Sequence, residues 1–242
     1  MNGAGKIKEL FRFDGYNLID LSYTFEVGMP AWPTHPHYSR EVVEEYENDS
    51  FFNKITFCEH NGTHMDAPLH FIPGAVGIDA LDYTKFFGRA LIVDAFTDYG
   101  VEHYLNKEHL LDWEEKHCPI QEDDMVFVRF GMDRKYALEP NDRPFIENWG
   151  GVSKDAAAYL AEKKISIIGT DTLCIDAFDN KDNDAHHIFL EHGIYILENL
   201  MHLGELPYAV GVAALPLKFK GGSGSPTRVI AFVPKEDGAA EG

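Results

Sequence analysis

The side chains best suited to chemistry in this chain of 242 residues are concentrated between residues 59 and 71, in the sequence E-H-N-G-T-H-M-D-A-P-L-H-F. Three histidines and one aspartate fall within eleven of these residues, namely His60, His64, Asp66 and His70. Imidazole and carboxylate groups together bind Zn(II), Mn(II) or Fe(II), and they also carry out acid/base catalysis. The segment therefore predicts a metal site, an acid/base site, or both.

The backbone of this segment is expected to be extended, with a tight turn at Gly62-Thr63. Gly62 and Pro68 both disfavour a continuous helix. The four candidates lie at even offsets from His60, so they can share one face wherever the chain is extended. A polar surface loop is the alternative, but such loops rarely carry apolar neighbours like Met65.

Upstream of this segment, a proline-rich loop is expected over residues 28–36. Within the loop, Trp32 is held between prolines and offers a large flat surface, which suits the wall of a site for an aromatic substrate. A hydrophobic plug over the edge of the core explains the tryptophan equally well. Phe51, Phe52 and Phe71, which are close to the motif in sequence, are expected to favour an aromatic substrate together with Trp32.

The rest of the chain alternates between strand and helix patterns, which predicts an α/β fold with a mixed β-sheet core and flanking helices. β-favouring or continuously apolar runs predict strands at 17–25, 54–59, 90–95, 124–130, 165–169, 194–197, 208–215 and 228–233. Amphipathic or capped patterns predict helices at 106–117, 153–164 and 184–191, with short helical turns at 7–11 and 81–87. Loops or turns are expected at 73–79, 131–151 and 220–227.

Two of these helices, at 106–117 and 153–164, have residues that indicate where the helix begins or which side is buried. Asn106 and Ser153 are expected to cap the first and second helices. In the first helix, Leu110, Leu111 and Trp113 are expected on one buried side.

Composition limits the classes of function. The chain carries 21 basic and 40 acidic residues, a formal charge of −19, which argues against a nucleic-acid or anionic-membrane partner. No signal-peptide pattern or run of membrane-spanning length is evident, so a cytoplasmic location is expected. Three cysteines without a C-x-x-C motif suit free thiols in a reducing compartment. We expect a lead-in at residues 1–16, one domain at 17–234 and a flexible tail at 235–242.

The pattern H-x-G-T-H-x-D-x-P-x-H resembles the signature of the cyclase family of metal-dependent hydrolases, which includes bacterial kynurenine formamidases and isatin hydrolases. All of its fixed positions are present, as His60, Gly62, Thr63, His64, Asp66, Pro68 and His70. The resemblance extends from about residue 17 to residue 233. It implies the swivelling β/β/α fold of that family and a homodimer or larger homo-oligomer.

The resemblance also implies residues outside the motif. In the family, a histidine in an A-H context and a glutamate in an I-L-E-N context complete the metal site, and His186 and Glu198 match them. His187 is the competing neighbour; adjacent residues on a helix point about 100° apart, so both histidines cannot face one metal. A tryptophan in a P-x-W-P context contacts substrate in kynurenine formamidases, and Trp32 matches it.

This inventory fits two divalent ions, Zn(II) or Mn(II), that share the Asp66 carboxylate, although a single ion is possible. One ion would be held by His60, His64 and Asp66, and the other by Asp66, His186 and Glu198. No thiolate is expected among the ligands. His70 remains as the general acid/base, unless it only orients His60 or His64.

The implied activity is hydrolysis of an amide C–N bond in a small aromatic molecule such as N-formylkynurenine or isatin. The same site could hydrolyse a lactone or another ester, and the residues do not discriminate between these reactions. A metal- or ligand-binding protein without catalysis is a further alternative. An unassigned His70 argues against it, because binding alone needs no base.

Overall fold

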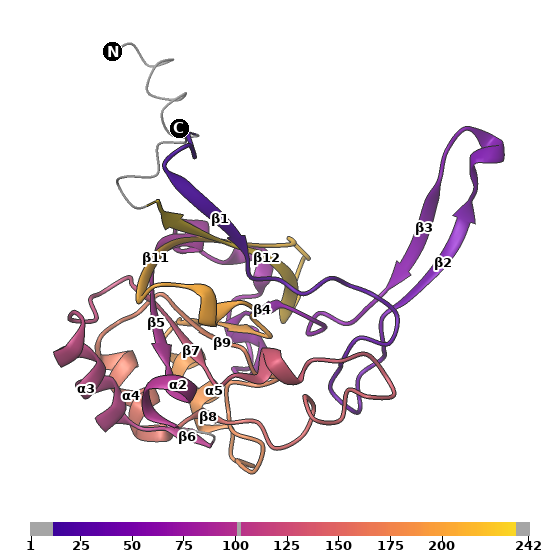
Figure 1. Cartoon of the computed structure of the whole chain (residues 1–242). Coiled ribbons are helices and arrows are strands. Elements are labelled where there is room, and N and C mark those ends of the chain that lie inside the picture. The colour runs from indigo at the N-terminus through magenta and orange to yellow at the C-terminus, as the bar shows by residue number, and fades with distance from the viewer. Residues whose placement is uncertain (1–11, 101–102, 236–242) are drawn as a thin grey trace.

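The computed structural model describes residues 12–100 and 103–235, and most of its strands form one mixed sheet (Figure 1). In spatial order the eight strands are β1 (Tyr16–Asp20), β12 (Gly224–Pro234), β11 (Ala209–Pro216), β5 (Phe87–Asp94), β7 (Met125–Arg129), β9 (Ile167–Thr170), β10 (Tyr195–Glu198) and β4 (His64–Asp66). β12 also pairs with β4, so the sheet closes into a barrel-like core. Sequence analysis predicted a mixed α/β fold, and the prediction is confirmed.

The centre of the sheet is parallel, from β5 through β7 and β9 to β10. Two parallel neighbouring strands need a crossover connection between them, and in this fold the connections contain helices. These helices are α2 (Ala95–Tyr99), α3 (Lys107–Lys116), α4 (Lys154–Glu162) and α5 (Asp184–Glu191). They gather on one side of the sheet, next to a short parallel pair of strands, β6 (Tyr104–Leu105) and β8 (Gly151–Val152) (Figure 1).

Successive side chains of the central strands point to opposite faces of the sheet, and they pack into two separate hydrophobic cores. On β5, Leu91 and Val93 pack with residues of the helices, while Ala90 and Ile92 pack inside the barrel. This explains the continuous apolar run, because both faces of the strand are buried. The Trp113 indole on α3 donates a hydrogen bond to the Ile92 carbonyl at 3.0 Å and ties the helix layer to the strand.

A two-stranded hairpin projects from the body of the molecule (Figure 1). It consists of β2 (Ser39–Glu44) and β3 (Phe52–Thr56), and we call residues 39–56 the arm. A short 3-10 helix, η1 (Tyr46–Asn48), forms the tip of the arm. The other 3-10 helices of the described residues are η2 (Pro68–His70), η3 (Ile78–Ala80), η4 (Tyr83–Phe86), η5 (Met132–Lys135) and η6 (Leu203–Glu205).

The predicted helices at 106–117, 153–164 and 184–191 correspond to α3, α4 and α5. Asn106 forms a capping box with His109, and Ser153 accepts from the Ala156 N–H, so both predicted caps are confirmed. Leu111 was wrongly placed on the buried side of α3, since it is 45% exposed. The helical turn expected at 7–11 lies outside the described residues.

Several predicted boundaries were wrong. The strand expected at 17–25 ends at Asp20, and the strand expected at 54–59 ends at Thr56 as one leg of the arm. The flexible turn expected at 220–227 is in part the start of β12, because residues 224–226 pair with β4. No helix in the described part of the chain combines the length and apolar character needed to cross a bilayer.

Gly169 in β9 is a position where the barrel leaves no room for a side chain. A Cβ atom there would lie 2.6 Å from the Phe127 ring and 2.8 Å from Leu200, both in the barrel core. We predict that Gly169→Ala lowers the free energy of unfolding by about 1–3 kcal/mol, because an overpacked core must shift. Urea denaturation measures the change. Gly15→Ala is the control, since nothing lies within 4 Å of its Cβ position; equal effects of the two substitutions would contradict the prediction.

Candidate metal centre

Strand pairing brings one histidine and two carboxylates to the same face of the sheet. In the antiparallel pair of β4 and β10, His64 lies opposite Glu198 and Asp66 lies opposite Ile196. Side chains alternate along each strand. Met65 therefore points into the barrel core, and the two motif residues that flank it point the other way, towards α5.

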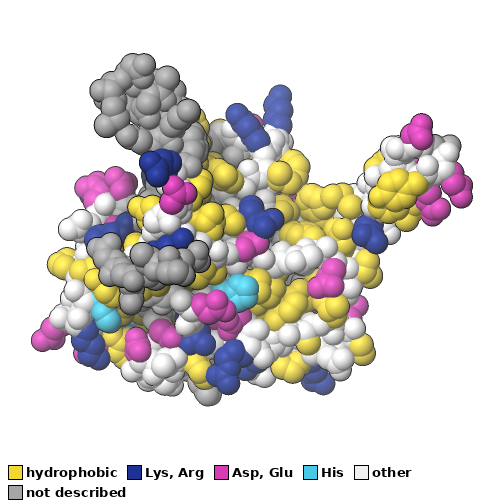
Figure 2. Space-filling model, turned by 45° about the horizontal axis from the view of Figure 1, so that its top comes forward, with side chains coloured by type: hydrophobic (Ala, Val, Ile, Leu, Met, Phe, Trp, Pro, Cys, Tyr) yellow, Lys and Arg dark blue, Asp and Glu magenta, His cyan; other side chains and the backbone are white. Residues whose placement is uncertain are grey.

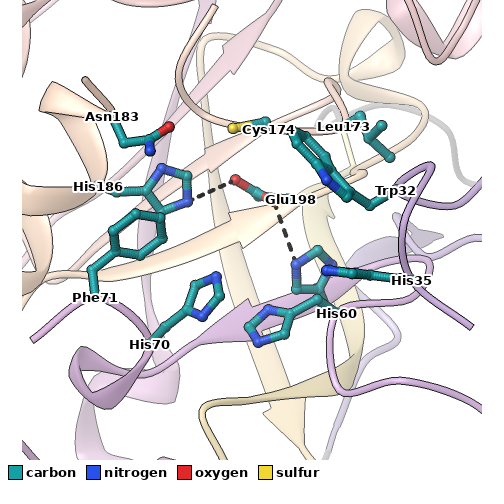
Figure 3. Close-up of a pocket in the computed structure, with 11 residues that line it drawn as sticks. Trp32, His35, His60, His70, Phe71, Leu173, Cys174, Asn183, His186 and Glu198 are labelled. Atoms are coloured by element: carbon teal, nitrogen blue, oxygen red, sulfur yellow. Dashed lines mark ion pairs between the residues drawn. The ribbon is translucent and has the colours of Figure 1, made fainter. Parts of the chain in front are cut away.

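Two further histidines complete a compact cluster. The His60 Nδ1 atom lies 2.7 Å from Asp66 Oδ1, and the His64 Nε2 atom lies 3.4 Å from both Asp66 Oδ1 and Glu198 Oε2. The first turn of α5 places His186 Nε2 at 3.5 Å from Asp66 Oδ2 and 3.4 Å from Glu198 Oε1. Figure 3 shows the His186 imidazole directed at the Glu198 carboxylate. All five predicted ligand residues therefore meet in one place.

The cluster is buried and electrostatically coupled. Burial alone would lower the pKa of His64, but the hydrogen bonds and charges of Asp66 and Glu198 outweigh it and raise the pKa to about 10. Burial alone would raise the pKa of Asp66, but the surrounding imidazoles, His60 first, hold it well below its usual range. Each group is thus held in its charged form by its neighbours, which is the response expected of ions removed from water.

The donor set fits a divalent metal. Asp66 is fully buried, and its Oδ2 atom has no hydrogen-bond partner. An orphaned carboxylate oxygen in the interior is costly unless a cation or a donor satisfies it. His60, His64 and Asp66 each offer one atom within a mutual distance of 4.8 Å, and so do Asp66, His70 and His186. Imidazole nitrogen and carboxylate oxygen suit Zn(II) or Mn(II).

The second ring nitrogen of each of the three predicted ligand histidines is fixed by the protein. The His186 Nδ1 atom lies 2.7 Å from Asp176, and the His64 Nδ1 atom lies 2.8 Å from the Gly62 carbonyl oxygen. Because these oxygens accept from Nδ1–H, Nε2 of both rings faces the carboxylates, and it is the nitrogen that would bind a metal once the metal replaces its proton. Sequence analysis missed Asp176, which has no local motif to mark it.

His60 is oriented from a distant part of the chain. Its Nε2 atom lies 2.9 Å from the Ser223 hydroxyl, and Ser223 donates to Glu59 at 2.7 Å. The residue directly after Ser223 has to be a glycine, because a Cβ atom on Gly224 would lie 2.5 Å from the His60 ring. The Gly/Ser-rich segment that was predicted as a flexible turn therefore helps to position His60.

A cavity of about 210 Å³ opens beside the cluster. Its walls combine aromatic, apolar and polar side chains: Trp32, His35, His60, His64, His70, Phe71, Leu173, Cys174, Asn183, His186 and Glu198. Trp32 packs edge-on against Trp149 at a centroid distance of 5.8 Å. The structure thus brings Trp32 to the cavity, as expected, together with His35, Cys174 and Asn183, which the sequence did not single out (Figure 3).

Cys174 places a sulfur close to the cluster, at a position that the sequence did not single out. It lines the cavity, and its sulfur lies within 4.8 Å of atoms of Asp176 and His186. Burial, with the nearby Glu198 charge, raises the pKa of the Cys174 thiol to about 11. The sulfur is therefore a neutral thiol at physiological pH, which is a much weaker metal ligand than a thiolate.

Other details of the sequence interpretation were wrong. Phe51 and Phe52 belong to the arm and are exposed, so they do not line the cavity. The four motif residues do not share one extended face, since only residues 64–66 form a strand, His60 lies in a turn and His70 ends η2. The choice of His186 over His187 agrees with the geometry, because His187 is exposed and its ring lies edge-on to Phe71, at 5.2 Å between ring centroids.

His70 lies between the cluster and the cavity. Its ring stacks on His60 at 3.9 Å and meets His186 edge-on at 6.0 Å. Burial is the main cause that lowers the pKa of His70, to about 4, so its imidazole is neutral at neutral pH. The side chain can accept a proton there, or it can join Asp66 and His186 as a ligand.

Comparison with known proteins agrees with this geometry. The Cyclase family, described as putative cyclase, matches residues 19–177. A kynurenine formamidase of Bacillus mycoides (strain KBAB4) is 32% identical over 216 residues, which cover 88% of this chain and 95% of that protein. The chain belongs to the cyclase family.

Solved structures show the same fold. Isatin hydrolase A from Labrenzia aggregata, bound to benzyl benzoate, superposes with a TM-score of 0.86 at 25% identity, over 97% of this chain and 100% of that chain. A predicted metal-dependent hydrolase from Bacillus stearothermophilus gives a TM-score of 0.72 at 26% identity, over 90% and 98% of the two chains.

Asp176 offers a test of how the site is built. We predict that Asp176→Asn weakens metal binding by roughly 10–100-fold, because an uncharged amide has a single acceptor oxygen and cannot serve both His186 and Ala185 as the two carboxylate oxygens do. Competition with a chelator measures the affinity, and circular dichroism checks that the variant is folded. Asp179→Asn is the matched control, since its exposed carboxylate contacts His103 and Tyr104 instead. Unchanged affinity in a folded Asp176 variant would contradict the role.

Proposed function

We propose that this protein is a metal-dependent amidohydrolase that cleaves the C–N bond of an aryl formamide or of a cyclic aryl amide. The single observation that carries the proposal is the orphaned Oδ2 atom of Asp66, inside a cluster of imidazoles and carboxylates at the wall of a partly aromatic cavity. Membership of the cyclase family supports it, as does the similarity to a kynurenine formamidase and an isatin hydrolase.

Each part of the cavity has a role in this reaction. His60, His64, Asp66, His186 and Glu198 would hold the metal, which when bound supplies an activated water and polarises the amide carbonyl. Trp32 and Phe71 both line the cavity and would contact the aromatic ring of the substrate from different sides. Their bulk also limits the access of bulk water to the reacting groups.

His70 moves the proton. Hydrolysis adds the oxygen of one water to the carbonyl carbon and breaks the C–N bond, leaving a carboxylate and an amine. The amide nitrogen is a poor leaving group unless it is protonated. A neutral His70 accepts a proton from the attacking water and delivers it to the departing nitrogen.

Several finer properties belong to the proposal. The metal is Zn(II) or Mn(II), with one or two ions per chain, because nitrogen and oxygen ligands suit both metals. The substrate is a small aromatic molecule. We also propose a cytoplasmic location, on the sequence features given above, and a homodimer or larger homo-oligomer.

The test of the proposed function is an assay of purified protein on N-formylkynurenine and on isatin, beside metal analysis of the same sample. Activity should be lost on treatment with a chelator and restored by Zn(II) or Mn(II). A protein that binds metal but hydrolyses neither amide, nor a matched lactone, would be a binding protein and would contradict the proposal.

Substitution of His70 separates catalysis from coordination. We predict that His70→Ala lowers kcat by ~10²–10⁴-fold, the usual weight of a general acid/base, with metal content almost unchanged. The loss should be smaller for an activated ester, whose leaving group needs less protonation. His187→Ala, on the exposed side of α5, is the control. Metal loss in parallel with activity would make His70 a ligand instead.

Glu198 distinguishes one ion from two. If two ions bind and share Asp66, Glu198→Gln removes a charge from the second position and should reduce the metal bound per chain at limiting metal concentration. Metal content per folded chain, measured by elemental analysis, gives the result. An unchanged stoichiometry would mean that a single ion is bound without Glu198.

A further inference from the structure

Asn183 lies directly before α5 but does not cap the helix. An asparagine at this position usually accepts a hydrogen bond from a backbone N–H of the first helical turn. The Asp176 carboxylate takes that place, because it accepts from the Ala185 N–H at 2.9 Å and from the His186 N–H at 3.2 Å. The Asn183 backbone is left-handed, with a φ of 51°, and its side chain forms no capping hydrogen bond. The amide is therefore free for another partner.

This free amide lies in the wall of the cavity beside the metal cluster. Figure 3 shows Asn183 next to His186, with Trp32 on the other side of the cavity. Asparagine tolerates the left-handed conformation better than most residues, so the position can be held without a capping bond. A half-buried amide that the protein itself leaves unused at this place is suited to bind a ligand.

Most other polar side chains of the cavity are already engaged. The histidines of the metal cluster contact its carboxylates, and His70 is the proposed acid/base. His35 remains, but its Nδ1 atom is buried and has no hydrogen-bond partner, which leaves only the other ring nitrogen for a ligand. The Asn183 amide offers two N–H donors and one acceptor oxygen. Asn183 is therefore the side chain best able to recognise a second polar group of the substrate.

The charges around the cavity favour a neutral group in that position. None of the described residues that line the cavity is a lysine or an arginine. Acidic side chains are scattered over the face shown in Figure 2, and the chain has a formal charge of −19. A carboxylate substituent would meet this charge without a cationic side chain to receive it. A carbonyl oxygen needs only a neutral N–H donor, which the amide supplies.

We propose that Asn183 forms a subsite for an aryl ketone, whose oxygen accepts a hydrogen bond from the Asn183 amide. This inference rests on the proposed function and deepens it. N-formylkynurenine and isatin both carry a ketone on the aromatic carbon next to the one that bears the amide nitrogen. Asn183 precedes His186 by three residues, so its amide lies near the cluster, where a group adjacent to the scissile amide must also lie. Asn183 thus determines substrate specificity.

Pairs of substrates that differ only in the ketone test the subsite. Ortho-formamidoacetophenone and formanilide are aryl formamides with and without it, and isatin and oxindole are the corresponding cyclic amides. Asn183→Gly removes the amide and suits the left-handed backbone. It should lower the ratio of kcat/KM between the ketone substrate and its ketone-free partner by about 3–10-fold, the usual weight of one neutral hydrogen bond. Asn183→Asp, which replaces the donor by an acceptor, should lower the ratio at least as far.

Asn148→Gly is the matched control, because Asn148 is also left-handed, with a φ of 55°, but lines a different cavity. It should leave the ratio unchanged. An unchanged ratio in Asn183→Gly would overturn the proposal. A ratio that falls only in His35→Ala would overturn it too, since the ketone would then be bound by His35. Equal losses on both members of each pair would mean that Asn183 only shapes the start of α5.

Binding of a ketone that contains no amide separates this inference from the proposed function. Indanone and indane differ only in the ketone, and quenching of tryptophan fluorescence measures their binding, since Trp32 lines the cavity. Metal-loaded wild-type protein should bind indanone about 3–10-fold more tightly than indane, and Asn183→Gly should reduce this preference. A wild-type protein with the preference that cleaves no amide or lactone would refute the proposed function alone. A wild-type protein that cleaves amides without the preference would refute the subsite alone.

Discussion

The structure depends on one electrostatic constraint, which is the burial of two carboxylates, Asp66 and Glu198, among three imidazoles. Removing a carboxylate from water costs several kcal/mol unless opposite charge and hydrogen bonds compensate it. The imidazoles of His60, His64 and His186 compensate part of this cost, and the remaining Oδ2 atom of Asp66 is left for a cation. The whole arrangement is therefore most stable with a divalent metal bound.

The fold explains how so much charge can be held in one place. β4 is only three residues long, but it is paired on both sides, by β10 and by β12. The backbone of the motif is thereby fixed, and its alternate side chains separate an apolar barrel core from a polar face. Asp176 and Ser223 then fix the rings of His186 and His60 through their second nitrogen atoms. Ligand geometry is thus determined by the closure of the sheet rather than by the motif alone.

The sequence predicted the parts of the fold and site that depend on local pattern. The bounds of α5, the cap of α4 and the cluster of residues 60–70 follow from spacing and residue type, and the resemblance supplied His186 and Glu198. The residues that were missed meet only through long-range pairing. Ser223 is 163 residues from His60, and no local signal marks it as a partner. The arm was missed because half-exposed strands have a weak hydrophobic pattern.

The central claim is that Asp66 holds the metal on which hydrolysis depends. The most direct test is the metal content of purified wild-type and Asp66→Asn proteins, with hydrolysis of N-formylkynurenine and isatin measured on the same samples. The substitution keeps the size of the side chain but removes its charge. The account predicts that the folded variant loses most of its metal and all measurable hydrolysis of whichever amide the wild-type protein cleaves. A folded Asp66→Asn protein with full metal content would contradict it.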